Sequence, residues 1–179
     1  MARYVFDQDH TAALFFVRHM MVSWVHGHFT KVSGTLDFDP GNMADLSVEV
    51  EIDASSLCTG VAKRDADLKS PNYFDVEKYP EISFKSRSAE CAAMDRCLVH
   101  GNLTVHGVIR PVTLDVSLAG PSRFQDEDKM YTTYGFCAKT RVNREDFGMT
   151  RNLGIEDGGF MVGKHAYLTI NVEADLVEE

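Results

Sequence analysis

The sequence lacks long apolar runs, and basic residues are a minority among its charged residues. No stretch approaches the roughly 20 consecutive apolar residues of a membrane-spanning helix, so we expect no stable membrane insertion. Eighteen Lys and Arg residues stand against 27 Asp and Glu residues, and the net charge is −9. Because such a chain is repelled by duplex nucleic acid and by anionic surfaces, we expect no nucleic-acid partner.

Cysteine motifs are also absent. The four cysteines form no Cys-x-x-Cys pair, which disfavours zinc ribbons and thioredoxin-type redox chemistry. We expect them to be reduced, partly buried thiols. The alternative is a cross-strand disulfide, since Cys91 and Cys97 flank a predicted turn. The first residues carry no apolar segment behind a basic one, so they do not resemble a secretory signal, and a cytoplasmic location is expected.

Motifs for catalysis are missing too. We find no Gly-x-Ser-x-Gly nucleophile elbow and no glycine-rich phosphate loop between a strand and a helix. Two pairs of oppositely charged residues lie near predicted loops: Arg64 with Asp65, and Arg144 with Asp146. We interpret both pairs as salt bridges that tie a predicted insertion, residues 54–80, to the main fold. The sequence therefore favours a protein that is not an enzyme and that needs no cofactor.

A period of two dominates the apolar residues that are present. The 179 residues, 44% of them hydrophobic, are typical of one globular domain, which we place over 1–179. Apolar and polar residues alternate clearly over 46–52, 112–118, 134–142 and 168–176, and less clearly over 13–19, 21–29, 33–38, 82–88 and 98–106. Short turns separate these segments. The pattern predicts an all-β antiparallel meander that closes into a barrel or splits into a sandwich.

One segment, residues 54–80, interrupts this alternation. Ser55 or Ser56 can cap a short helical turn, the residues 61–69 favour helix, and Ser70-Pro71 ends it. We therefore expect a short helical insertion that covers one end or one side of the barrel.

The interior of a barrel of about eight strands is either filled by side chains or holds one small ligand. The inward positions mix large apolar residues such as Phe84 with small ones such as Ala138, which fits tight packing and a tunnel equally well. If a tunnel exists, its walls are hydrocarbon, and its ligand is an elongated apolar molecule such as a lipid tail.

Four histidines support the alternative hypothesis, in which the protein is an enzyme. His26 and His28 lie on one face of a predicted strand at a spacing that some metal sites use, although no third ligand follows nearby. Together with His19 and His100 they would serve a metal-dependent or other enzyme at the barrel mouth.

Several short motifs in a fixed order resemble those of the YceI-like family of polyisoprenoid-binding proteins, from about Tyr4 to Leu176. The most specific ones lie in and around the insertion: Ile52-Asp53-Ala54-Ser55-Ser56, Lys63-Arg64-Asp65 and Tyr73-Phe74-Asp75-Val76. Two further motifs follow along the chain, Gly101-Asn102-Leu103-Thr104 and Asn143-Arg144-Glu145-Asp146-Phe147-Gly148. The chain departs from the family pattern at Asp67, where members usually have a histidine.

The resemblance implies an eight-stranded antiparallel lipocalin-like β-barrel with an extended apolar cavity. It also implies a ligand that is a polyprenyl chain or the tail of an isoprenoid quinone. Homodimers are common in the family, and Leu14 and Phe16, apolar on the face opposite Phe15, are consistent with a dimer contact or with burial under the insertion.

The alternation places ten side chains on the wall of the cavity, and a one-residue slip would invert any strand. The predicted wall residues are Phe15, Val17, His19, Val48, Val50, Phe84, Leu114, Val116, Phe136 and Ile170. On the insertion, Leu68, Tyr73 and Phe74 are expected to cover the entrance.

Overall fold

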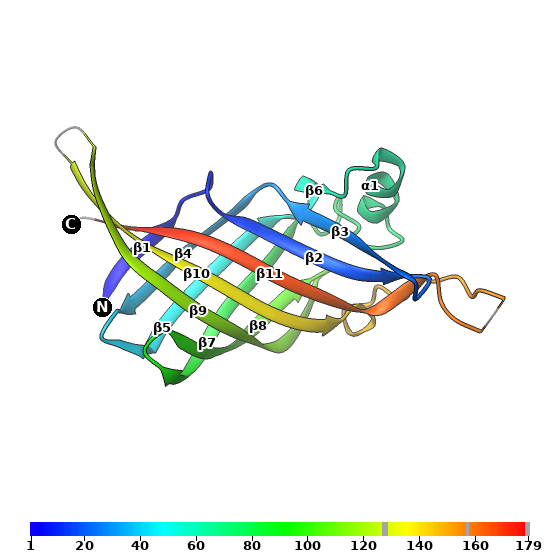
Figure 1. The fold of residues 1–179 in the computed structure, drawn as a ribbon. Coiled ribbons are helices and arrows are strands. Elements are labelled where there is room, and N and C mark those ends of the chain that lie inside the picture. The colour runs from blue at the N-terminus through cyan, green and yellow to red at the C-terminus, as the bar shows by residue number, and fades with distance from the viewer. Residues whose placement is uncertain (127–128, 157, 178–179) are drawn as a thin grey trace.

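Antiparallel strands form most of the computed structural model, which describes residues 1–126, 129–156 and 158–177 (Figure 1). The strands are β1 (Ala2–Phe6), β2 (Ala12–His19), β3 (Ser23–Phe29), β4 (Val32–Asp39), β5 (Asn42–Asp53), β6 (Leu57–Cys58), β7 (Glu81–Ala93), β8 (Arg96–Val105), β9 (Val108–Asp126), β10 (Lys129–Asn143) and β11 (Val162–Leu176). The helical elements are the α-helix α1 (Ala62–Lys69) and the 3-10 turns η1 (Ala54–Ser56) and η2 (Arg144–Phe147).

Eight of these strands close into a barrel in the order β1-β4-β5-β7-β8-β9-β10-β11, and β11 pairs back onto β1. The long strand β11 has two partners on that side. Its C-terminal end pairs with β1, where Leu176 faces Tyr4, and its N-terminal half pairs with β2, where Leu168 faces Phe15. Strands β2, β3 and β6 thereby extend the sheet beyond the closed part. The predicted eight-stranded antiparallel barrel is confirmed.

All nine predicted strands correspond to observed ones, and two short strands were missed. Strand β1 has only Tyr4 and Phe6 as buried positions, and β6 has two residues, so neither offers enough alternation to be recognised. The predicted strand at 21–29 begins later, at Ser23. Met20 and Met21 form the turn instead, with φ values of 48° and 58°.

The hairpins are longer than the sequence pattern indicated, and this corrects the expectation for two cysteines. Strand β7 continues past residue 88 to Ala93, which places Cys91 directly opposite Cys97 on β8. The two cysteines form a disulfide, whereas Cys58 and Cys137 are free. The expectation of four reduced thiols is therefore wrong for this pair.

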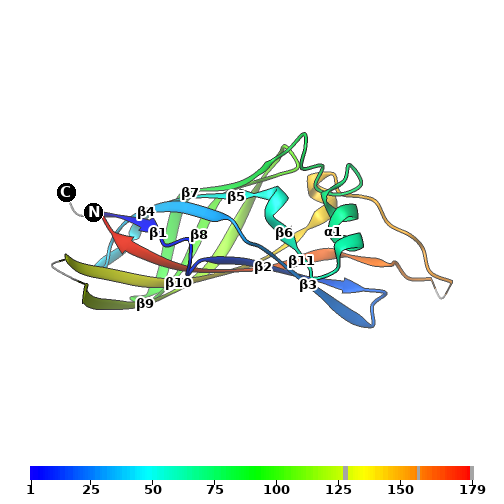
Figure 2. The same cartoon turned by 90° about the horizontal axis from the view of Figure 1, so that it is seen from above.

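The helical insertion lies at one end of the barrel, where α1 and the connection that precedes β7 cover the strand ends (Figure 2). It starts where Asp53 caps η1 by accepting a hydrogen bond from the Ser55 amide at 2.9 Å. Among the described residues, no helix is long and apolar enough to cross a membrane.

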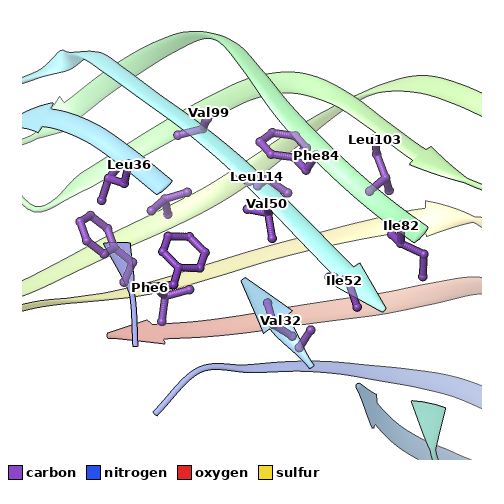
Figure 3. Packing of buried hydrophobic residues seen from close by; sticks show 14 of the residues in the cluster. Phe6, Val32, Leu36, Val50, Ile52, Ile82, Phe84, Val99, Leu103 and Leu114 are labelled. Atoms are coloured by element: carbon purple, nitrogen blue, oxygen red, sulfur yellow. The ribbon is translucent and has the colours of Figure 1, made fainter. Parts of the chain in front are cut away.

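The core fills the inside of the barrel. Phe6, Val50, Phe84 and Leu114 point from four different strands toward one another (Figure 3). Two aromatic rings lie directly over glycines: a Cβ on Gly27 would be 2.1 Å from the Phe15 ring, and one on Gly101 would be 2.4 Å from the Phe84 ring. Glycine is therefore required at both positions for the rings to lie flat on the sheet.

Candidate functional site

The candidate site is an apolar cavity of about 50 Å³ within the barrel. Every residue that lines it is apolar, and the lining comes from all eight barrel strands. The lining residues are Phe6, Leu36, Leu46, Val48, Val50, Phe84, Val99, Leu114, Val116, Phe136, Ala138, Ile170 and Val172. With no donor or acceptor in its wall, the cavity can interact with a guest only by apolar contact.

Most of the predicted wall residues lie at this cavity. The structure brings together Val48, Val50, Phe84, Leu114, Val116, Phe136 and Ile170. They share a wall because the alternation of each strand is the one that the sequence pattern indicated.

The three predicted wall residues on β2 do not line the cavity. Phe15 is buried as predicted, but its ring packs against the Phe29 ring, 5.7 Å between centroids. Val17 is half-buried against the core, and His19 is half-buried at the end of β2, opposite Ser23. The reason is position along the barrel: β2 pairs with the N-terminal half of β11 and so lies toward the insertion, beyond the cavity.

The insertion residues close that end of the barrel. Leu68 and Phe74 pack against the core, and the Phe74 ring meets the Phe29 ring edge to face at 5.8 Å. Phe15, Phe29 and Phe74 thus form a continuous series of aromatic contacts from the barrel to the insertion. Tyr73, next to Phe74 in the chain, is half-buried. The predicted covering role fits these positions for Leu68 and Phe74.

Aromatic side chains also close the opposite end. The Phe38 ring lies 5.1 Å from Tyr134 and 5.4 Å from Phe136, and the Tyr4 ring lies 4.7 Å from Phe38. Burial, together with the neighbouring Tyr134 hydroxyl, raises the pKa of Tyr4, so its phenol is neutral. The cavity therefore lies between two aromatic clusters.

Six lining residues are not among the predicted wall residues, although Ala138 was expected to face inward: Phe6, Leu36, Leu46, Val99, Ala138 and Val172. Two of them could have been found from cross-strand register, because Ala138 faces Ile170 and Val172 faces Phe136. Phe6 lies on β1, which the pattern did not reveal. The sequence contains no signal for which strand pairs with β1.

The size of the cavity answers the question of tunnel or packed interior. A volume of about 50 Å³ holds a few water-sized molecules, whereas ligand sites usually measure on the order of 300–1,000 Å³. The interior is hydrocarbon, as expected, but it is close to filled. A longer guest requires rotation of large side chains, of which Phe6, Phe84 and Phe136 are the aromatic ones in the wall.

The predicted salt bridge at Arg144 is not formed. Arg144 is buried, and its guanidinium donates to the backbone carbonyls of Gly163 at 3.0 Å, of Arg151 at 3.1 Å and of Met149. Burial lowers the pKa of Arg144. These bonds hold the segment after η2 across the insertion end of the barrel.

The other predicted pair, on α1, also has a different role. The Thr59 amide donates to the Asp65 carboxylate at 2.9 Å, and Arg64 donates to the Thr59 hydroxyl at 2.7 Å. Both side chains therefore fix the start of the insertion around Thr59 and do not tie it to the barrel.

The histidines do not assemble a site at the barrel mouth. His26 and His28 are exposed on the outer face of β3, and His100 lies 2.8 Å from the Thr113 hydroxyl. In the described part of the chain, three potential metal ligands come together once, as Asp7, His10 and Glu173, which include none of the predicted histidines.

Comparison with known proteins identifies relatives over nearly the whole chain. The sequence profile of the YceI-like domain matches residues 4–174. "Protein YceI" of Salmonella newport (strain SL254) is 34% identical over 155 residues, which are 86% of this chain and 79% of the relative.

Solved structures with the same fold include a Campylobacter jejuni YCEI protein, with a TM-score of 0.73, 27% identity and 90% of each chain covered. Burkholderia cenocepacia BcnA has a TM-score of 0.78 at 22% identity, with 94% of this chain and 98% of that one covered. A domain from Saccharophagus degradans, described as polyisoprenoid binding and implicated in plant cell wall breakdown, has a TM-score of 0.71 at 15% identity, with 99% and 100% covered.

Proposed function

The chain belongs to the YceI-like family, and from this premise we propose that it is a non-enzymatic binding protein for a long isoprenoid-type lipid. The ligand is a polyprenyl chain or the tail of an isoprenoid quinone, held inside the barrel. The observation that carries the proposal is the all-hydrocarbon lining of the cavity. The polyisoprenoid-binding description of one structural relative supports the same ligand class.

Apolar burial alone is sufficient for such binding. Burial contributes about 0.8 kcal/mol per CH₂ group, so one five-carbon isoprene unit contributes roughly 3–4 kcal/mol before ordering costs. A few units give micromolar affinity after the losses of association. A polar anchor is therefore not needed, which fits a wall without donors or acceptors.

Binding of a long chain requires the interior to open. The cavity is small and aromatic clusters close both ends, so the rings of Phe6, Phe84 and Phe136 have to move as the lipid enters. We expect association to be slow for this reason, because a rearrangement precedes or accompanies each productive encounter.

The direct test is extraction of the protein purified without detergent, followed by mass spectrometry of the organic phase. We expect a polyprenyl-containing lipid to be recovered with the wild-type protein. Recovery of no lipid, together with no uptake when a polyprenyl quinone is added, would refute the proposal.

A matched pair of variants on β10 locates the lipid. Ala138→Phe places a ring in the cavity and is expected to lower the lipid-to-protein ratio by more than about tenfold. Cys137→Phe adds the same ring at the next residue, which faces outward, and is expected to retain the lipid. If Ala138→Phe does not fold, Ile170→Ala enlarges the cavity, and retained or increased uptake is the expected result.

A cytoplasmic location and a homodimer remain predictions from the sequence. Size-exclusion chromatography with light scattering measures the oligomeric state, and cell fractionation measures the location.

A further inference from the structure

One outer face of the barrel carries basic and aromatic side chains and is bordered by acidic Asp115, which lies on β9 opposite Lys139, whereas the protein as a whole has a net charge of −9. Across strands β10, β11, β2 and β3, Arg141, Tyr167, Phe16 and His26 are directly opposite one another. Directly paired residues share a face of the sheet. We call this surface the aromatic–basic face; it comprises Leu14, Phe16, Arg18, Trp24, His26, His28, Lys139, Arg141, Tyr167 and Thr169.

Lys139 has an acidic residue directly opposite, Asp115 on β9, and interacts with it electrostatically, but the three cations of this face form no salt bridge among the described residues. Arg18, Lys139 and Arg141 form no ion pair with any residue in the described part of the chain. The acidic neighbours at its borders are already engaged: Arg96 binds Asp115 at 2.6 Å, and Lys164 binds Glu145 at 3.1 Å. The face therefore presents a local positive charge toward solvent.

An apolar turn continues the face at one end. Met20, Met21 and Val22 connect β2 to β3, and Met21 and Val22 are 44% and 79% exposed. The turn is well anchored, because the Met20 amide donates to the Met161 carbonyl at 2.8 Å and Arg18 donates to the Met21 carbonyl. In both views it extends past the barrel at the end that carries α1 (Figures 1 and 2).

Trp24 joins the turn to the face. It is 43% exposed, Arg18 lies 4.9 Å from its ring centroid, and its ring meets that of Tyr167 edge to face at 5.4 Å. Amphipathic rings and cations next to an apolar tip match the chemistry of the bilayer interface, where Trp and Tyr lie at headgroup depth and Lys and Arg meet lipid phosphates.

We propose that the aromatic–basic face and the Met20–Val22 turn form a docking surface for an anionic lipid bilayer. Charge complementarity selects this end of the molecule. The β9–β10 hairpin at the other end also exposes apolar side chains, Phe124 and Met130, but Lys139 and Arg141 lie toward the opposite end of β10 and Arg18 lies on β2. The inference rests on the proposed function in one respect, since a membrane is the source of the lipid.

The test is co-sedimentation of the full chain with vesicles of phosphatidylcholine alone and of phosphatidylcholine containing phosphatidylglycerol. We expect binding to the anionic vesicles that weakens as salt is raised, and little binding to the neutral ones. Each Lys or Arg near an anionic surface contributes about fivefold to the partition coefficient. The triple variant Arg18→Gln, Lys139→Gln, Arg141→Gln is therefore expected to bind on the order of a hundredfold more weakly.

Two matched double variants test which exposed apolar segment contacts the membrane. Met21→Ser with Val22→Ser is expected to weaken binding, whereas Phe124→Ser with Met130→Ser, on the β9–β10 hairpin, is expected to leave it unchanged. Equal losses in both, or a triple variant that binds as the wild type does, would overturn the proposal.

Other occupants give distinct results. If the protein binds duplex DNA as tightly as anionic vesicles, the face is a general polyanion-binding surface. If the protein does not bind vesicles but forms a dimer that Tyr167→Glu dissociates, the face is a contact between two copies of the chain. Either result overturns the proposal. Because the assay measures attachment and not lipid uptake, Ala138→Phe should dock normally, and failure of the docking surface is distinguished from failure of the lipid site.

Discussion

At the scale of single residues, two aromatic rings of the sheet lie so close over glycines that an added Cβ would clash with them. Gly27 lies beneath Phe15, and a Cβ there would come within 2.1 Å of the ring. We expect Gly27→Ala to lower the free energy of unfolding by about 1–3 kcal/mol, because the ring has to leave its position. Urea denaturation measures the change.

The control for this prediction is Gly154→Ala, where an added Cβ meets nothing within 4 Å. That variant should stay within about 0.5 kcal/mol of the wild type. Combining Gly27→Ala with Phe15→Leu should recover part of the loss; additive losses would contradict the proposed clash.

The surface residues Asp7 and His10 form a contact that responds to pH. The hydrogen bond from His10 to Asp7, at 2.7 Å, is the main cause of the raised pKa of His10 and of the lowered pKa of Asp7. The His10 contribution to stability is present below its ordinary pKa of 6.5 and disappears as pH rises through its raised value. The Asp7 contribution is present above its ordinary pKa of 3.8 and disappears as pH falls through its lowered value.

The contact is therefore strongest between the two shifted pKa values. We expect an NMR titration of His10 to show a raised pKa, and Asp7→Asn to return that pKa toward 6.5. Glu173→Gln should have a smaller effect, because the Glu173 carboxylate lies 3.9 Å away and acts through charge alone. A larger effect of Glu173→Gln than of Asp7→Asn would contradict this assignment.

At the scale of secondary-structure elements, the β7–β8 hairpin is closed by the disulfide between Cys91 and Cys97. The bridge closes a loop with a sequence separation of 6, and in the chain-entropy description a loop of that size contributes about 2 kcal/mol. We expect reduction to lower the free energy of unfolding by about this amount. Thiol alkylation with mass detection should count two reactive cysteines before reduction and four after it, the two being Cys58 and Cys137. Four alkylated cysteines without reductant in the unfolded protein would show that the bridge is absent.

At the scale of the whole molecule, ligand binding should appear as added stability. A ligand present at about one hundred times its Kd raises the free energy of unfolding by about 2.7 kcal/mol, which corresponds to roughly 5–10 °C in Tm for a chain of this size. We expect a polyprenyl quinone to produce this shift in the wild type and in Cys137→Phe. No shift is expected in Ala138→Phe, and an equal shift there would place the ligand outside the cavity.

Much of the fold could be predicted from the sequence, because period-two alternation fixes which residues face inward on each strand. This is why the inward positions of β5, β9 and β10 were correct for Val50, Leu114 and Phe136. The pattern contains no information on how far along the barrel each strand lies. Phe15 was therefore placed at the cavity although it packs nearer the insertion.

Other features could not be predicted because they depend on contacts between residues far apart in the sequence. The disulfide depends on where the β7–β8 hairpin ends, and the lining residue Phe6 depends on closure of β11 onto β1. The carbonyl cage around Arg144 likewise depends on the path of the backbone after η2, which charge spacing does not reveal. The volume of the cavity is a sum over the packing of all eight strands and follows from no single motif.

The position of Trp24 determines what optical spectroscopy can report about this protein. It is the one tryptophan in the chain, and it lies on the outside of the barrel beside Arg18. Its emission should therefore be insensitive to a guest in the interior. A blue shift on addition of anionic vesicles, or its absence, would report directly on contact at the outer surface, without any label.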